Sequence, residues 1–138
     1  MRKTNKQTEE ESYSNWLEET ARGKRDRVKP DCQILMDYLD EIGLQYEHKP
    51  AIMLKDRCKG YIPDLLFHHP AADVIVDFIR PNKYITWDYC KAKAADLEGD
   101  GYIYYIIMAD QLVNSKGNGA QVFFEEIDGE ITKLSKRN

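Results

Sequence analysis

Residues 61–67 (YIPDLLF) and 74–80 (VIVDFIR) are the two stretches that decide the fold of this chain. Both are rich in β-branched, aromatic and other large apolar residues, a composition that favours strands. The connection between them (HHPAAD) is short and contains a proline, which is typical of a turn. The two stretches are therefore predicted to be adjacent strands of one sheet, and each carries a single aspartate, Asp64 and Asp77.

Helices are predicted on the N-terminal side of these strands. Residues 8–22 have a composition that favours a helix, with apolar side chains at helical spacing and carboxylates toward its N-terminal end. A second helix is expected to begin at Pro30, because proline is favoured in a first turn, and to end at Gly43. Residues 45–55 are predicted to be extended, and residues 56–60 to form a charged turn.

Three further elements are predicted on the C-terminal side. Residues 83–97 have the apolar spacing of an amphipathic helix. Residues 102–108 (YIYYIIM) are an unbroken run of strand-forming residues, which predicts a central strand covered on both faces. Residues 121–134, with Asp-Gly near their centre, are typical of a β-hairpin with a tight turn.

This order of elements predicts an α/β (α+β) fold, a mixed β-sheet flanked by helices. The chain has 138 residues, a length that fits one ordinary domain. Residues 1–28 are interpreted as an N-terminal helix and basic linker, and residues 29–138 as the α/β domain.

Composition narrows the class of protein. The hydrophobic fraction is 42% and the charged fraction 32%, as in globular proteins with a well-solvated surface. No apolar run is long enough to cross a bilayer, and the polar N-terminus lacks the apolar segment of a signal peptide, so no membrane contact and a cytoplasmic location are expected. Cys32, Cys58 and Cys90 are widely spaced and predicted to be reduced thiols.

A basic stretch stands out against the net charge of −4. The basic stretch spans residues 22–29, and five of these eight residues are cationic: Arg22, Lys24, Arg25, Arg27 and Lys29. Such a stretch can contact the phosphates of a nucleic acid, and it can equally be a solvated linker between two helices.

Asp64 and Asp77 are the sharpest chemical feature, because a lone carboxylate in an apolar strand is costly to bury unless it is hydrogen-bonded or bound to a cation. Two carboxylates on neighbouring strands can converge on a divalent ion, which can activate water and stabilise charge on a phosphate. The alternative is that each lies at the end of its strand, solvated or capping a turn.

The succession of a helix ending in DEIGLQYEHKP, a turn, YIPDLLF, a short hairpin and VIVDFIRP resembles the PD-(D/E)xK nuclease superfamily. It looks closest to transposon-end endonucleases of the TnsA type and to phage enzymes that cleave branched DNA. The resemblance spans residues 31–110 and implies a restriction-endonuclease-like core. It also implies that Asp64 and Asp77 hold Mg²⁺ or Mn²⁺ against a DNA phosphate.

Two positions depart from the family pattern. The family lysine lies two residues after the second acid, on the same strand face, and here that residue is Ile79. In some relatives the cation comes from the following helix, so Lys91 is the candidate substitute, followed by Lys93 and Arg80; a plain surface lysine is the alternative.

The second departure concerns the family glutamate in the preceding helix. The corresponding position is Cys32, beside Asp31. Asp31 is a candidate third catalytic carboxylate, and the simpler account is a charge that stabilises the helix N-terminus. Arg80 and Lys83 join the basic stretch as candidate DNA-binding residues.

The resulting hypothesis is a metal-dependent DNA endonuclease from a phage or mobile element. The alternative is a catalytically inactive nuclease-fold protein that binds DNA or docks onto a protein, and a third is a small interaction protein with an acidic surface. A homodimer is expected if the DNA is a two-fold symmetric junction. Sequence signatures of NTPases, serine hydrolases and zinc proteases do not occur in the chain.

Overall fold

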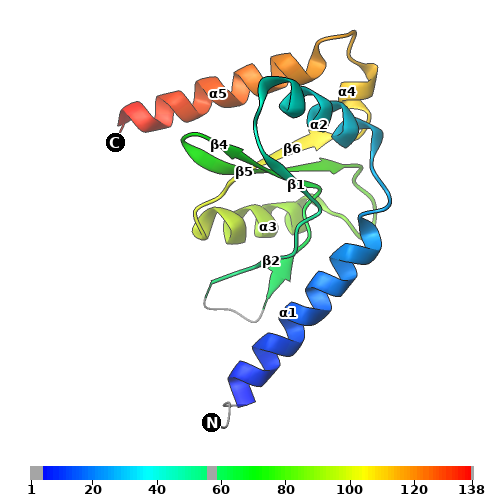
Figure 1. Cartoon of the computed structure of the whole chain (residues 1–138), viewed down its shortest axis with the longest axis vertical. Coiled ribbons are helices and arrows are strands. Elements are labelled where there is room, and N and C mark those ends of the chain that lie inside the picture. Colours follow the sequence, from blue (N-terminus) through cyan, green and yellow to red (C-terminus); the bar gives the residue numbers. More distant parts are fainter. Residues whose placement is uncertain (1–4, 56–58, 138) are drawn as a thin grey trace.

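The computed structural model describes residues 5–55 and 59–137. Residues 56–58 of the charged turn predicted at residues 56–60, Cys58 among them, lie outside these ranges. The elements are α1 (Asn5–Lys24), α2 (Pro30–Ile42), β1 (Tyr46–His48), β2 (Ile52–Met53), β3 (Gly60–Tyr61), β4 (Leu65–His69), β5 (Ala72–Ile79), α3 (Trp87–Gly99), β6 (Ile103–Met108), α4 (Gln111–Asn114) and α5 (Gly119–Arg137) (Figure 1).

The main sheet has four strands in the order β1-β4-β5-β6, and β2 and β3 form a separate two-stranded sheet. β4 is antiparallel to both β1 and β5, whereas β5 and β6 are parallel and connected through α3. A parallel pair requires such a crossover connection. The predicted mixed sheet flanked by helices is confirmed. The predicted pairing of residues 61–67 with residues 74–80 is confirmed from Leu65 onward; Tyr61 instead belongs to β3 of the small sheet, and Asp64 lies just before β4.

Apolar side chains from both faces of the main sheet build the core. On one face, alternate residues of β4 and β5 pack against α2, α4 and α5; on the other, they pack against α3 and the small sheet. Figure 1 shows the resulting three layers, with the sheet between the two sets of helices. Because side chains alternate along a strand, Val76 and Phe78 face α2, whereas Ile75 lies in the α3 cluster.

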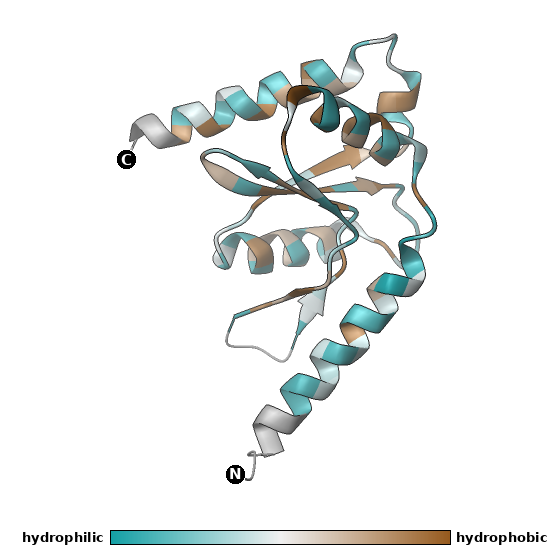
Figure 2. Cartoon of the chain, in the orientation of Figure 1, coloured by the Kyte–Doolittle hydropathy of each residue, from teal (hydrophilic) through white to brown (hydrophobic). Residues whose placement is uncertain are grey.

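Helix α1 extends away from this body and is mostly hydrophilic (Figure 2). Within residues 9–24 of α1 the buried side chains are Leu17 and Ala21, and a Cβ on Gly60 of β3 would lie 2.5 Å from a Leu17 methyl carbon. The glycine therefore permits the close approach of α1 to the small sheet. Among the described helices, none combines the length and apolar character of a bilayer-spanning segment.

The C-terminal prediction was wrong: residues 119–137 form helix α5, and not a β-hairpin. Ala120, Ile127 and Ile131 are buried at helical spacing and pack in the same cluster as α2. The single Asp-Gly pair suggested a turn, yet one glycine inside a helix costs only about 1 kcal/mol. Burial of this apolar stripe outweighs that cost.

The prediction for residues 102–108 was half right. β6 contacts both hydrophobic clusters, through Ile107 on one face and Tyr104 on the other. It is nevertheless an edge strand, since it ends the order β1-β4-β5-β6. An unbroken apolar run indicates that both faces of a strand are covered, but it does not indicate whether the strand has a neighbour on each edge.

Two helix boundaries near the site follow local chemistry. α2 begins at Pro30 and ends before Gly43, whose φ of 78° is left-handed, as predicted. α3 begins at Trp87, four residues later than predicted. The Asn82 side chain accepts hydrogen bonds from the amides of Tyr84 and Ile85. Thr86 caps α3 by accepting from Tyr89 N.

Candidate functional site

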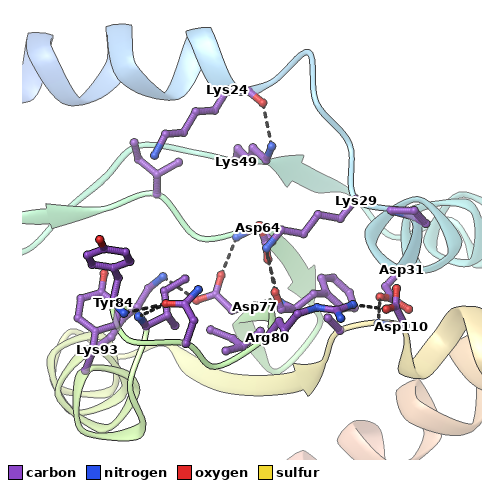
Figure 3. A pocket seen from close by; sticks show the side chains of 18 residues that line it. Lys24, Lys29, Asp31, Lys49, Asp64, Asp77, Arg80, Tyr84, Lys93 and Asp110 are labelled. Carbon is purple, nitrogen blue, oxygen red and sulfur yellow. Dashed lines mark hydrogen bonds and ion pairs between the residues drawn. The ribbon is translucent and has the colours of Figure 1, made fainter.

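A polar pocket of about 810 Å³ lies where α1, α2, β5 and the loop before α3 meet (Figure 3). Its wall carries five cationic and four acidic side chains: Lys24, Lys29, Lys49, Arg80, Lys93, Asp31, Asp64, Asp77 and Asp110. Such a mixture suits an anionic ligand whose charge is neutralised locally.

Asp64 and Asp77 meet in the middle of this pocket (Figure 3). Asp64 directly precedes β4 and Asp77 lies in β5, and Leu65 pairs with Val76, so the sheet register brings the two aspartates together. Asp64 N donates to Asp77 Oδ1 at 2.7 Å, and Phe78 N donates to Asp64 Oδ2 at 2.8 Å. The convergence expected of the two carboxylates is therefore present, with each hydrogen-bonded to the backbone of the other's segment.

The second oxygen of Asp77 binds two side chains. Lys93 Nζ and Tyr104 Oη both lie 2.6 Å from Asp77 Oδ2. Burial is the main cause that raises the pKa of Tyr104, and the neighbouring Asp77 charge adds to it, so the phenol remains a hydrogen-bond donor. Asp77 is only 3% exposed and Lys93 7%, which makes this a buried ion pair.

Lys93, and not Lys91, supplies the cation from the helix. Ile79 shares the α3-facing side of β5 with Asp77 and is buried, so the strand position of the family lysine carries no charge. Lys91 is exposed and does not line the pocket. A signal for Lys93 was present in the sequence, because it lies between Cys90 and Leu97 on the stripe that α3 buries.

Lys29 lies on the side of the two aspartates that is opposite to Lys93 (Figure 3). Its Nζ is 2.9 Å from Asp64 Oδ2 and 2.8 Å from the carbonyl oxygen of Phe78. Lys29 was a candidate for contact with DNA phosphates, as part of a basic stretch that could equally be a solvated linker, whereas its ammonium here connects the segment before α2 to the Asp64 carboxylate. A cation is thus held between two oxygens that are both suitable ligands for a hard metal ion.

Asp31 is buried beside the pocket and serves the backbone of the segment after β6. One carboxylate oxygen accepts from Asp110 N, and the other accepts from Leu112 N and Val113 N at 2.9 Å each. These amides are the unsatisfied donors at the start of α4. Both oxygens of Asp31 therefore bind backbone amides at the start of α4, although Asp31 itself lies in the first turn of α2.

Lys49 was missed by the sequence analysis. It has a left-handed backbone, with φ of 48°, and its buried ammonium donates to the carbonyls of Lys24 and Arg27. Burial lowers the pKa of Lys49. Carbonyls at a helix C-terminus attract cations, so Lys49 fastens the end of α1 to the sheet. No local pattern marked it, since its partners are more than twenty residues away.

The remaining basic candidates have separate surroundings. Arg25 is bound to Glu18 and to the carbonyl of Lys49, and Arg80 forms an ion pair with Asp110. Lys83 lies over the ring of Tyr84. Arg22 and Arg27 are exposed and lie outside the pocket wall. Of the predicted basic stretch, only Lys24 and Lys29 line the pocket.

Cys32 lies beneath the site and is buried. Its thiol is 3.9 Å from the carbonyl of Asp64. Burial, followed by the nearby charge of Asp64, raises the pKa of the Cys32 thiol to about 12. The thiol is thus neutral and contributes no charge where the family pattern has a glutamate.

Across residues 9–55 and 59–134, no three His, Cys, Asp or Glu side chains are grouped as metal ligands, so any ion here would depend on two carboxylates and backbone oxygens. The chain matches no protein-family model, and no curated protein is similar to it in sequence. The interpretation of this pocket therefore depends on its own geometry.

Proposed function

We propose that this chain is a metal-dependent DNA endonuclease with a restriction-endonuclease-like core, which hydrolyses phosphodiester bonds at the pocket around Asp64 and Asp77. The order α2, β1, β4, β5, α3, β6, with a parallel final strand pair, supports a core of this kind. The observation that carries the proposal is the arrangement of Asp64, Asp77 and Lys93 in one polar pocket.

The donor set fits a divalent cation. Asp64 Oδ2 and the Phe78 carbonyl already share the ammonium of Lys29, which stands in for a cation between two hard oxygens. Asp77 adds a second carboxylate next to them. Mg²⁺ or Mn²⁺ bound here would supply Lewis acidity toward a phosphate oxygen and a bound water.

The chain's own cations then have distinct tasks. Lys93 is held in place by its ion pair with Asp77 and can donate a hydrogen bond to a phosphate oxygen or to water in the pocket. Lys29 is half exposed and can turn from Asp64 to a DNA phosphate. Arg80 and Lys24 line the wall at greater exposure and suit contacts with the DNA backbone, which would make binding strongly dependent on salt.

Cleavage of plasmid and of branched DNA in Mg²⁺ or Mn²⁺ tests the proposal directly. We expect turnover by the wild type and its loss in Asp64→Asn. The matched control is Asp73→Asn, which removes an exposed aspartate from β5, away from the pocket. Equal cleavage by the wild type and Asp64→Asn would exclude the assignment, provided that both proteins have the same circular dichroism spectrum.

One observation favours a second candidate, a nuclease-fold protein that binds DNA or a protein without cleaving. Both carboxylates are already neutralised, Asp64 by Lys29 and Asp77 by Lys93, and the buried Ile79 replaces a polar group. In that case the wild type and Asp64→Asn would bind DNA with equal affinity, with or without Mn²⁺, and neither would release a cleavage product. Metal-dependent turnover that is abolished by Asp77→Ala would exclude this candidate.

The proposal includes DNA as partner, a homodimer where the DNA is two-fold symmetric, and a cytoplasmic location. The location is supported by Cys32 and Cys90, which are both free thiols and buried. Sedimentation of the protein with and without a four-way junction tests for the homodimer.

A further inference from the structure

Tyr84 is an exposed aromatic side chain on the wall of the proposed active site. Its exposed fraction is 77%, and it lines the same pocket as Asp64 and Lys93. In Figure 3, Tyr84 and Lys93 lie on one side of the two aspartates and Lys29 on the other. The ring is therefore presented to solvent within reach of any ligand that enters the pocket.

The loop that carries Tyr84 is held in a defined conformation. Asn82 Oδ1 accepts from the amides of Tyr84 and Ile85 at 2.7 and 2.8 Å, and Asn82 N donates to the carbonyl of Ile85. This turn leads directly into the cap of α3 at Thr86. A ring presented on an ordered turn loses little conformational entropy when a ligand stacks on it.

We infer that Tyr84 is a stacking site for an unpaired nucleobase of the strand whose phosphate enters the pocket. The inference rests on the proposed nuclease function and names its substrate class: DNA with unpaired nucleotides, such as overhangs, flaps and branch points. Bases inside a duplex are covered on both faces, so only an unpaired base can present its face to Tyr84. The cations Lys83, over the ring, and Arg80, on the pocket wall, suit the adjoining phosphates.

Fluorescence anisotropy with labelled DNA tests the inference. Two ligands are compared in EDTA, where no cleavage occurs: a blunt duplex and the same duplex extended by a short single-stranded overhang. We expect Tyr84→Ala to weaken binding of the overhang DNA by about 5- to 150-fold, the loss expected for one stacked base, and to leave blunt-duplex binding unchanged.

Two variants sharpen the test. Tyr84→Phe keeps the ring and should bind like the wild type. Trp16→Ala removes another exposed aromatic, 55% exposed on α1 and not part of the pocket wall, and should also bind like the wild type. Because Tyr84 is so exposed, these changes should leave the circular dichroism spectrum and the melting temperature unaltered.

Three outcomes would overturn the inference: equal overhang affinity in Tyr84→Ala and the wild type, an equal loss for both DNAs, or a loss in Tyr84→Phe as large as in Tyr84→Ala. The nuclease proposal is read separately, from cleavage in Mg²⁺ by the wild type and Asp64→Asn. Tyr84-dependent overhang binding without cleavage would support stacking and reject the nuclease. If cleavage requires Asp64 but Tyr84→Ala keeps the overhang preference, the stacking site is rejected and the nuclease proposal is retained.

Discussion

Lys93 Nζ, from helix α3, lies 2.6 Å from Asp77 Oδ2 of strand β5, and both residues are buried. The pair brings a cation to the second aspartate from a helix, while the strand position two residues later is the apolar Ile79. A buried pair of this kind costs desolvation energy on both sides, so each partner depends on the other.

Removing one partner should therefore destabilise the fold strongly. Asp77→Ala leaves the Lys93 ammonium buried without its carboxylate and should lower the free energy of unfolding by about 3–5 kcal/mol. The double variant Asp77→Ala with Lys93→Met should lose less than the sum of the two single variants, because neither charge is then left alone. Equilibrium unfolding in urea measures all four proteins; strictly additive losses would contradict the coupling.

Lys29 should compete with a divalent cation for Asp64. Lys29→Met removes the ammonium from Asp64 Oδ2 and should tighten Mn²⁺ binding about 5-fold, corresponding to about 1 kcal/mol for a half-exposed ion pair. Calorimetric titration with Mn²⁺ measures the affinity. Lys24→Met, which removes an equal charge from the wall of the same pocket, is the control. Identical gains in both variants would point to general charge, and not to occupancy of Asp64.

Asp31 should matter for stability and not for metal affinity. Asp31→Ala leaves three backbone amides at the start of α4 without their acceptor and should cost about 3 kcal/mol of unfolding free energy. Hydrogen exchange at Leu112 and Val113 of α4 should accelerate before exchange in the main sheet does. Mn²⁺ affinity should stay at the wild-type value; a decrease as large as that in Asp64→Asn would instead make Asp31 a third metal ligand.

Alkaline pH should destabilise the protein through Cys32. Burial raises the pKa of its thiol from the ordinary value of 9.0 to about 12, so above pH 9 the unfolded chain releases a proton that the folded chain keeps. Stability is therefore lost as pH rises from 9 toward 12, by about 1.4 kcal/mol at pH 10. Urea unfolding in EDTA at pH 8 and pH 10 should show a steeper decline for the wild type than for Cys32→Ala.

Gly129 provides a test of helix α5. It lies inside the helix, is exposed, and no heavy atom would lie within 4 Å of an added Cβ. Gly129→Ala should raise the free energy of unfolding by about 0.5–1 kcal/mol, because alanine loses less backbone entropy in a helix. A hairpin with Asp-Gly in its turn would be destabilised by the same change. The melting temperatures of Gly129→Ala and the wild type show whether the change stabilises or destabilises the protein.

The sequence by itself determined those features that depend on neighbours along the chain. The β-branched stretches predicted two paired strands, and Pro30 and Gly43 marked the ends of α2, because strand propensity and helix caps act over a few residues. The aspartates could be predicted to converge because Asp64 directly precedes one strand, Asp77 lies in the next, and a short turn joins the two strands.

Only the tertiary structure decided which groups surround those aspartates. Lys29 reaches Asp64 across 35 positions and Asp31 reaches Leu112 across 81, distances at which no local periodicity carries information. The same holds for α5, where an apolar stripe buried against α2 outweighed the turn preference of Asp-Gly. Local propensities are worth about 1 kcal/mol, whereas burial of several large apolar side chains is worth several times more, so packing between distant segments made the final choice.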